Sequence, residues 1–115
     1  MANRSKQKGT AYETEIAQYL RSRGWVHAER RALAGHNDLG DITGIPGCVI
    51  EAKACKTFDL PGWLNELEQE VANARADVGF VFVRRRGTSD RGRDYAVMTV
   101  RQACDLLARL EGWAQ

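Results

Sequence analysis

The sequence predicts a single α/β domain in which helices flank a mixed central β-sheet. The chain has 115 residues, which suits one domain with a core of its own. Hydrophobic residues make up 43% of it and charged residues 28%, as in a globular protein and unlike a disordered one. Segments with helical spacing of apolar residues alternate with short apolar segments. The resulting order of elements is α-β-β-β-α-β-β-α.

Three segments are predicted to be helices. The first covers about residues 11–23, with Thr10 as its N-cap. The second begins at Pro61, which suits a first helical turn, follows the capping residue Asp59 and ends near residue 76. The third follows Thr99. Its apolar positions have helical spacing and are Ala103, Leu106, Leu107 and Leu110.

Five segments are predicted to be strands, namely residues 25–33, 41–43, 48–53, 79–84 and 94–98. A polar loop with Gly35 follows the first strand, and a Pro46-Gly47 turn folds the second strand back beside the third. The fourth strand begins Gly-Phe-Val-Phe-Val and is apolar throughout, as in a central strand that is covered on both faces.

The second and third strands carry the most informative residues of the chain. Side chains alternate between the faces of a strand, so Glu51 and Lys53 share one face with Val49. Two charges on an otherwise apolar strand are costly unless they pair or bind a metal ion. Asp41 lies on the neighbouring strand. Two carboxylates and a lysine are what a hard divalent cation and an activated water require.

Two further acidic residues are considered for this site, Glu13 as an additional member and Asp38 as an alternative to Asp41. Glu13 lies in register with Ile16 and Leu20 on the apolar side of the first helix, an unusual place for a glutamate. The alternative is that its long side chain reaches solvent beside the stripe. Asp38 is a rival for the metal position, and Asp41 is favoured because it lies within the strand.

Basic residues gather in two segments. Residues 1–9 are predicted to form a basic, flexible arm with Arg4, Lys6 and Lys8, ahead of a single domain at residues 10–115. Five arginines crowd the segment after the fourth strand, at positions 84, 85, 86, 91 and 93. Such clusters suit the phosphates of nucleic acid, although any one cluster is more commonly solvated surface charge.

The cysteines and the apolar runs bear on the compartment. Cys48, Cys55 and Cys104 are odd in number and lack CxxC spacing, which indicates neither a disulfide framework nor a zinc site. We expect Cys48 and Cys104 to be buried, reduced thiols. No apolar run approaches membrane-spanning length, and the N-terminus leads into no signal-peptide core. A cytoplasmic protein without a membrane partner is expected.

These motifs resemble the PD-(D/E)XK nuclease superfamily and, within it, the archaeal-type Holliday-junction resolvases. The resemblance covers residues 8 to about 100. It rests on Lys8-Gly9 before a helix with Glu13, on Glu29-Arg30-Arg31 and the Ala34-Gly35 loop, on Gly40-Asp41-Ile42 and on Glu51-Ala52-Lys53. The chain departs from the family at Gly40, where a proline is usual, and at Ala34-Gly35, where the resolvases often carry a serine.

The resemblance implies a restriction-endonuclease-like core and a metal-dependent DNA endonuclease that resolves four-way (Holliday) junctions in DNA recombination and repair. Its catalytic residues would be Glu13, Asp41, Glu51 and Lys53. Mg²⁺, with Mn²⁺ as a substitute, would be held by Asp41, Glu51 and the Ala52 carbonyl, and by Glu13 through a water. Lys53 would orient the attacking hydroxide and stabilise the phosphate.

The resemblance and the charge pattern together give the expected partners. The residues expected to contact DNA are Arg4, Lys6, Lys8, Arg30, Arg31, Lys56, Arg84, Arg85 and Arg86. Gln69 and His36 are auxiliary candidates. For Lys56 the alternative is a solvated side chain without a role.

Paired cuts in branched DNA imply a homodimer. Its interface is expected from Phe80-Val81-Phe82-Val83 and from Leu106, Leu110 and Trp113 of the last helix, with Trp63 as a further candidate. Two other functions stay open. One is a nuclease of the same fold that acts on flap, single-stranded or duplex DNA, and the other is a non-catalytic nucleic-acid-binding module.

Overall fold

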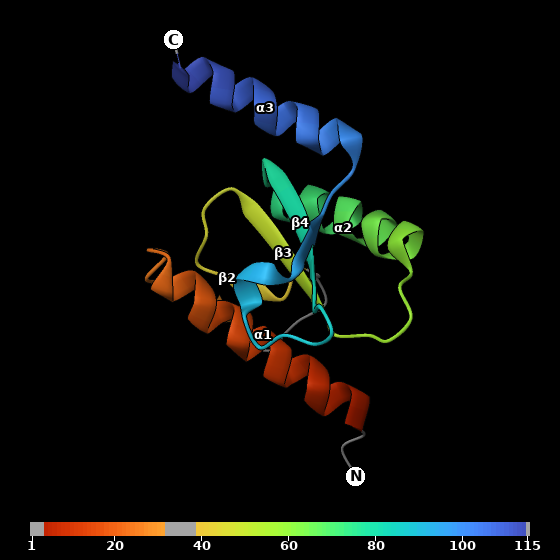
Figure 1. The fold of residues 1–115 in the computed structure, drawn as a ribbon. Coiled ribbons are helices and arrows are strands. Elements are labelled where there is room, and N and C mark those ends of the chain that lie inside the picture. Colours follow the sequence, from red (N-terminus) through yellow and green to blue (C-terminus); the bar gives the residue numbers. More distant parts are fainter. Residues whose placement is uncertain (1–3, 32–38, 115) are drawn as a thin grey trace.

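The computed structural model describes residues 4–31 and 39–114, with the side chains of residues 9–31 and 39–112. It contains three helices around a five-stranded sheet (Figure 1). The elements are α1 (Arg4–Ser22), β1 (Glu29–Arg30), β2 (Ile42–Thr43), β3 (Cys48–Lys53), α2 (Leu60–Ala74), β4 (Val78–Val83), the short 3-10 helix η1 (Arg91–Arg93), β5 (Tyr95–Val97) and α3 (Val100–Ala114). The predicted α/β class, mixed sheet and order of elements are confirmed.

The strands follow one another across the sheet in the order β1-β2-β3-β4-β5. β3 and β4 are parallel and are connected through α2, and the other neighbours are antiparallel. In the register, Lys53 lies opposite Val83, and Val83 lies opposite Tyr95. Residues opposite one another on neighbouring strands share a face, so these three side chains point to the same side of the sheet.

Each face of the sheet has its own apolar layer. Tyr12, Ile16 and Leu20 of α1 pack with Ile50 and other residues on one face. On the other face, Trp63 and Leu67 of α2 pack against the valines of β3 and β4, which are Val49, Val81 and Val83. β4 is thus covered on both sides, and its buried valines are not available for the predicted subunit interface. Trp63, another interface candidate, is a core residue.

Two predicted boundaries were wrong. The first helix begins at Arg4, so Lys8 to Thr10 lie inside α1 and Thr10 is not an N-cap. Residues 4–9 therefore belong to a helix, whereas a flexible arm was expected. The first strand contains only Glu29–Arg30. Trp25 lies in a turn in which its N–H donates to Leu20 O at 3.1 Å, and its side chain is exposed.

The second helix starts as predicted. Asp59 is its N-cap and accepts the N–H of Gly62 at 3.1 Å. The cysteines were predicted less well, because Cys104 is exposed and Cys48 is only partly buried. The loop at residues 34–35, His36 and Asp38 lie outside the described residues, as do the side chains of Arg4, Lys6, Lys8 and Trp113.

α3 leaves the sheet at the end of β5 and extends away from the other layers (Figure 1). Its inner side is fixed by Gln102, whose Oε1 accepts the N–H of Gly79 at 3.0 Å, and by an ion pair of 2.9 Å between Arg109 and Asp77. Leu107 and Leu110 are exposed. Among the described helices, none is both long and apolar enough to cross a membrane.

Candidate active site and metal centre

Asp41 is held where β2 begins, next to β3. Its N–H donates to Ile50 O at 2.8 Å, and its Oδ2 accepts the N–H of Ala52 at 2.8 Å. The carboxylate therefore continues the β2–β3 pairing beyond the last backbone pair and is fixed against the strand that carries Glu51.

Gly40, directly before Asp41, has a backbone conformation that requires glycine. Its φ is +98°, a conformation that proline cannot adopt and that other L-residues rarely do. A Cβ on Gly40 would lie 2.8 Å from Val49 Cγ1 and 3.1 Å from Ile50 O. The absence of a side chain at position 40 is thus a condition for the placement of Asp41.

The Ala52 carbonyl lies on the Asp41 side of β3. The N–H and C=O of one residue in a regular strand point to the same side, and the Ala52 N–H points to Asp41. The Lys53 carbonyl points the other way, towards β4, where it accepts the N–H of Arg84 at 2.9 Å. Asp41 and the Ala52 oxygen are therefore on one side of the strand.

Glu51 and Lys53 share the α2 face of β3, as predicted. Lys53 Nζ lies 3.6 Å from Glu51 Oε2 and 3.8 Å from Glu66 Oε2. Glu51 is only 3% exposed, so this contact lies at the edge of the core. Lys53 connects the buried carboxylate of the strand to the more exposed carboxylate of α2.

The site includes a residue that the sequence analysis missed. Carboxylate oxygens of Glu51, Glu66 and Glu70 lie within 4.8 Å of one another, and Glu70 is 1% exposed. Gln69, the auxiliary candidate, is exposed, and its side chain donates to Asn73 at 3.1 Å. The buried polar residue that α2 contributes to the site is therefore Glu70, whereas Gln69 was the expected auxiliary residue.

A signal for Glu70 was present in the helical spacing. Trp63, Leu67 and Glu70 occur at positions i, i+4 and i+7 of one helix, so they lie on the same buried side of α2. A glutamate on the apolar side of a helix is unusual, as was noted for Glu13, and this marks Glu70 as a candidate site residue. Glu66 precedes Glu70 by one helical turn, which brings both to β3.

Glu13 reaches the site from α1, on the opposite side of the sheet. Its Oε2 lies 3.4 Å from Nε of Arg30 in β1, and Asp41 is a charged neighbour of its carboxyl group. Arg30 is thus positioned by the candidate site, and the backbone N–H of Arg31 donates to Asp41 O at 2.7 Å. The solvent-reaching alternative for Glu13 does not hold.

The pKa values of two carboxyl groups, those of Glu51 and Glu13, are raised. Burial, a hydrogen bond with Glu70 and the charges of Asp41 and Glu70 raise the pKa of Glu51 to about 11, although Lys53 opposes them. Burial and the Asp41 charge also raise the pKa of Glu13 against the effect of Arg30. Burial alone would lower the pKa of Lys53, but the charges of Glu51, Glu66 and Asp41 outweigh it and raise that pKa. Lys53 is therefore a cation at neutral pH.

Among the described residues, the acidic side chains close enough to share a cation are Glu51, Glu66 and Glu70, and the expected set of Glu13, Asp41 and Glu51 is not such a group. Asp41, Glu51 and the Ala52 carbonyl offer only oxygen ligands, which Mg²⁺ and Mn²⁺ prefer. Carboxylates brought together in a buried place repel one another, and a bound cation removes that repulsion. The pKa of Glu51 is raised mainly by burial, and the charges of Asp41 and Glu70 add to that effect.

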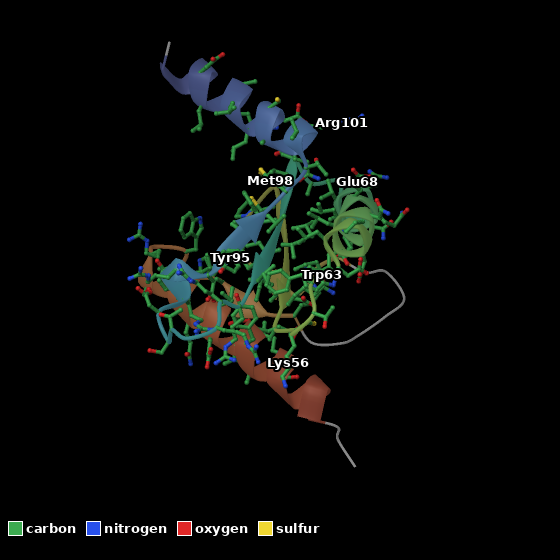
Figure 2. All side chains as sticks on the ribbon, turned by 45° about the vertical axis from the view of Figure 1, so that its right-hand side comes forward. Lys56, Trp63, Glu68, Tyr95, Met98 and Arg101 are labelled. Carbon is green, nitrogen blue, oxygen red and sulfur yellow. The ribbon has the colours of Figure 1, made fainter. Side chains whose placement is uncertain are left out.

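The basic residues near the site divide into two groups. Lys56, labelled in Figure 2, and Arg84, Arg85 and Arg86 are exposed. Arg91 is buried and lies 3.5 Å from both Glu15 and Asp94, with its guanidinium over the Tyr12 ring. Arg91 therefore stabilises the fold and does not belong to the charged surface.

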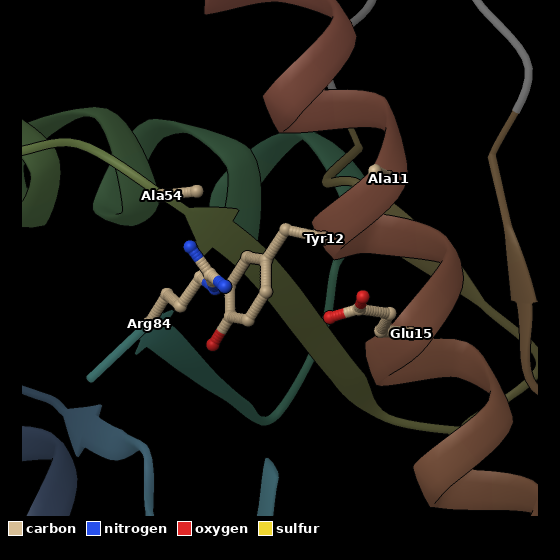
Figure 3. A pocket seen from close by; sticks show the side chains of 5 residues that line it. All are labelled: Ala11, Tyr12, Glu15, Ala54 and Arg84. Carbon is tan, nitrogen blue, oxygen red and sulfur yellow. The ribbon is translucent and has the colours of Figure 1, made fainter. Parts of the chain in front are cut away.

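A pocket of about 150 Å³ lies beside the site, between α1 and the ends of β3 and β4 (Figure 3). Arg84 and Glu15 lie on either side of the Tyr12 ring there, and Ala11 and Ala54 complete the lining. The Tyr12 hydroxyl donates to Asp94 Oδ2 at 2.8 Å, which fixes the ring.

Comparisons of the chain with protein-family models, with curated proteins and with solved structures found no match. What the site does must therefore be inferred from its own geometry and chemistry.

Proposed function

We propose that the protein is a Mg²⁺-dependent endodeoxyribonuclease that hydrolyses phosphodiester bonds, with branched DNA such as a four-way junction as its preferred substrate. One observation carries the proposal. Asp41 lies between Glu13 of α1 and the Glu51–Lys53 pair of β3, so that groups from both faces of the sheet converge at one place. A structural ion pair would need only two of these groups.

Each group has a role that its surroundings support. Asp41, Glu51 and the Ala52 carbonyl would hold Mg²⁺, with Glu13 acting through a water. When bound, the ion supplies a water of lowered pKa and a positive charge for the phosphate. Lys53 keeps its proton and stabilises the negative charge that develops on the phosphate.

Glu66 and Glu70 have supporting roles in this proposal. The buried Glu70 carboxyl group lies within 4.8 Å of that of Glu51 and packs against it in the core. Glu66 shares Lys53 with Glu51 and holds the ammonium group near the site from the solvent side. Both orient other residues and do not touch the phosphate.

A cleavage panel tests the proposal. We expect a labelled four-way junction to be cut faster than a flap, a single strand or a linear duplex of the same sequence, and EDTA to abolish cutting. Cleavage is measured on denaturing gels with the Lys53→Ala variant as the control. Faster cutting of flap, single strand or duplex would support another nuclease of this fold, and binding without cutting would support the non-catalytic module.

The proposed enzyme acts as a homodimer that pairs through α3. The apolar residues Val100, Ala103, Leu107 and Leu110 have the spacing 3-4-3, which is the same in both chain directions. Two antiparallel copies of α3 therefore place Val100 opposite Leu110, and the small Ala103 opposite the larger Leu107. A two-fold interface needs such self-complementarity. Leu107 is 58% exposed and is buried by this pairing.

The variant Leu107→Asp is expected to convert the dimer to a monomer, because a carboxylate would be buried without a partner at the centre of the interface. Light scattering coupled to gel filtration measures the mass. The control is Ala108→Asp, which introduces the same charge at an exposed position next to the stripe. A wild-type protein with the mass of one chain at assay concentration would contradict this interface.

A further inference from the structure

Two aromatic side chains lie open to solvent on the α2 face of the sheet. Phe58 is 47% exposed and Tyr95 is 44% exposed. Their rings contact each other edge to face with centroids 6.3 Å apart, and Phe58 also lies 5.8 Å from the Trp63 ring. Aromatic rings gain much free energy from burial, so an exposed pair is a candidate binding surface.

The pair lies close to the candidate active site. Lys53, Val83 and Tyr95 form one row across β3, β4 and β5 and point to the same face. Neighbouring strands are about 4.8 Å apart, so the Tyr95 and Lys53 backbones are about 10 Å apart. That span corresponds to roughly three nucleotides at about 3.4 Å per stacked base. Tyr95 and Trp63 are labelled in Figure 2.

The surroundings of the pair are positively charged. The Arg85 guanidinium lies 5.9 Å from the centre of the Tyr95 ring, and the Arg85 N–H donates to Asp94 Oδ1 at 2.9 Å, which fixes the chain there. Arg84, Arg86 and Arg93 are also exposed in the segment between β4 and β5, where arginines outnumber the two acidic residues, Asp90 and Asp94. Open aromatic rings with arginines around them bind the bases and phosphates of single-stranded nucleic acid.

We propose that Phe58 and Tyr95 form a stacking site for a nucleobase whose face is left open at a branch point or in a single strand of the DNA that is cut beside Lys53. The site rests on the proposed function and makes its substrate class more specific. Bases in a continuous duplex are stacked on one another and their faces are covered, whereas a branch point, a flap or a single strand offers open faces. The arginines would bind the phosphates on either side of the stacked base.

Binding of DNA in EDTA tests the stacking site without any cleavage. Tyr95→Leu and Phe58→Leu keep an apolar side chain beside Trp63 but remove the aromatic face. Stacking is worth about 1–3 kcal/mol per base, so each variant should bind single-stranded and branched DNA about 5- to 150-fold more weakly in fluorescence anisotropy. Their affinity for a fully paired duplex should not change.

Trp25→Leu is the matched control. Trp25 is 46% exposed and precedes β1, at the sheet edge opposite β5. Its replacement removes an exposed aromatic ring but should leave all affinities unchanged. Tyr95→Phe keeps the aromatic face and should bind like the wild type, which separates stacking from any effect on folding. A 2-aminopurine base in the single strand should be quenched by the wild type and not by Tyr95→Leu.

The outcomes separate this inference from the function on which it rests. Equal losses on duplex and single strand, or no loss on either, would overturn the stacking site. If the wild type cuts DNA with Mg²⁺ while the leucine variants bind as it does, the nuclease stands and the stacking site falls. If the wild type neither binds nor cuts any DNA, both fall.

Discussion

Replacing Lys53 by alanine should lower the rate of DNA cleavage by about 10³-fold and leave DNA affinity within about threefold of the wild type. Lys53 is partly buried among carboxylates, so its charge acts on the reacting phosphate and adds little to the surface that holds DNA. Single-turnover cleavage and anisotropy measure the two effects on the same protein.

The control for this variant is Lys56→Ala. Lys56 is exposed and follows Lys53 by three residues, so its replacement removes the same charge from the nearby surface. It should weaken binding slightly and leave the cleavage rate of bound DNA unchanged. A Lys53→Ala protein that cuts DNA as fast as the wild type would rule out the proposed site.

Asp41→Asn gives the same test at the metal position. An asparagine oxygen can still accept the N–H of Ala52, so the pairing of β2 and β3 is retained while the charge is lost. Cleavage should again fall by about 10³-fold, and the variant should remain folded by circular dichroism. Activity that survives this change would point to another aspartate as the ligand.

Replacing Glu51 by glutamine should abolish Mg²⁺-dependent cleavage and at the same time stabilise the metal-free protein at alkaline pH. The buried carboxyl group has a pKa of about 11 in the fold and an ordinary value of 4.5 when unfolded. The folded state therefore binds the extra proton between these values, and stability falls as pH rises from about 5 to about 11. Glutamine has nearly the same shape as the protonated acid, but its side chain does not titrate between pH 5 and pH 11.

Thermal unfolding in EDTA at pH 6, 7.5 and 9 measures this effect. The wild-type Tm should fall with pH more steeply than that of Glu51→Gln, and about 1 kcal/mol corresponds to a shift of about 4 °C in a domain of this size. Mg²⁺ should raise the wild-type Tm and leave that of the variant nearly unchanged. Glu66→Gln, at an exposed position, is the control and should keep the wild-type slope. Equal slopes for Glu51→Gln and the wild type would contradict the buried, protonated carboxyl group.

The part of the site that lies on strands could be predicted from the sequence, because side chains alternate between the two faces of a strand. Alternation of side chains placed Glu51 and Lys53 on one face, and the turn at Pro46 placed Asp41 beside them. Glu70 could not be placed with equal certainty, because its contact with Glu51 depends on how α2 rotates on the sheet. That rotation is set by the packing of Trp63 and Leu67 and not by any local pattern.

Element boundaries were predicted less well for a similar reason. Thr10 has the side chain of an N-cap, but α1 continues through it, and its carbonyl accepts the Thr14 hydroxyl at 3.0 Å within the helix. Apolar residues near Trp25 have the composition of a strand, yet the chain turns there after α1 ends. Local preference was overridden at both places by the wider fold.

The position of the site across the sheet has a consequence for when it can act. Glu13 comes from the layer of α1, and the partners of Glu51 come from the layer of α2 on the other face. A nascent chain, or one from which either layer has come away, lacks part of the carboxylate cluster. The proposed cutting activity would therefore require both layers to be in place and would be confined to the fully folded protein.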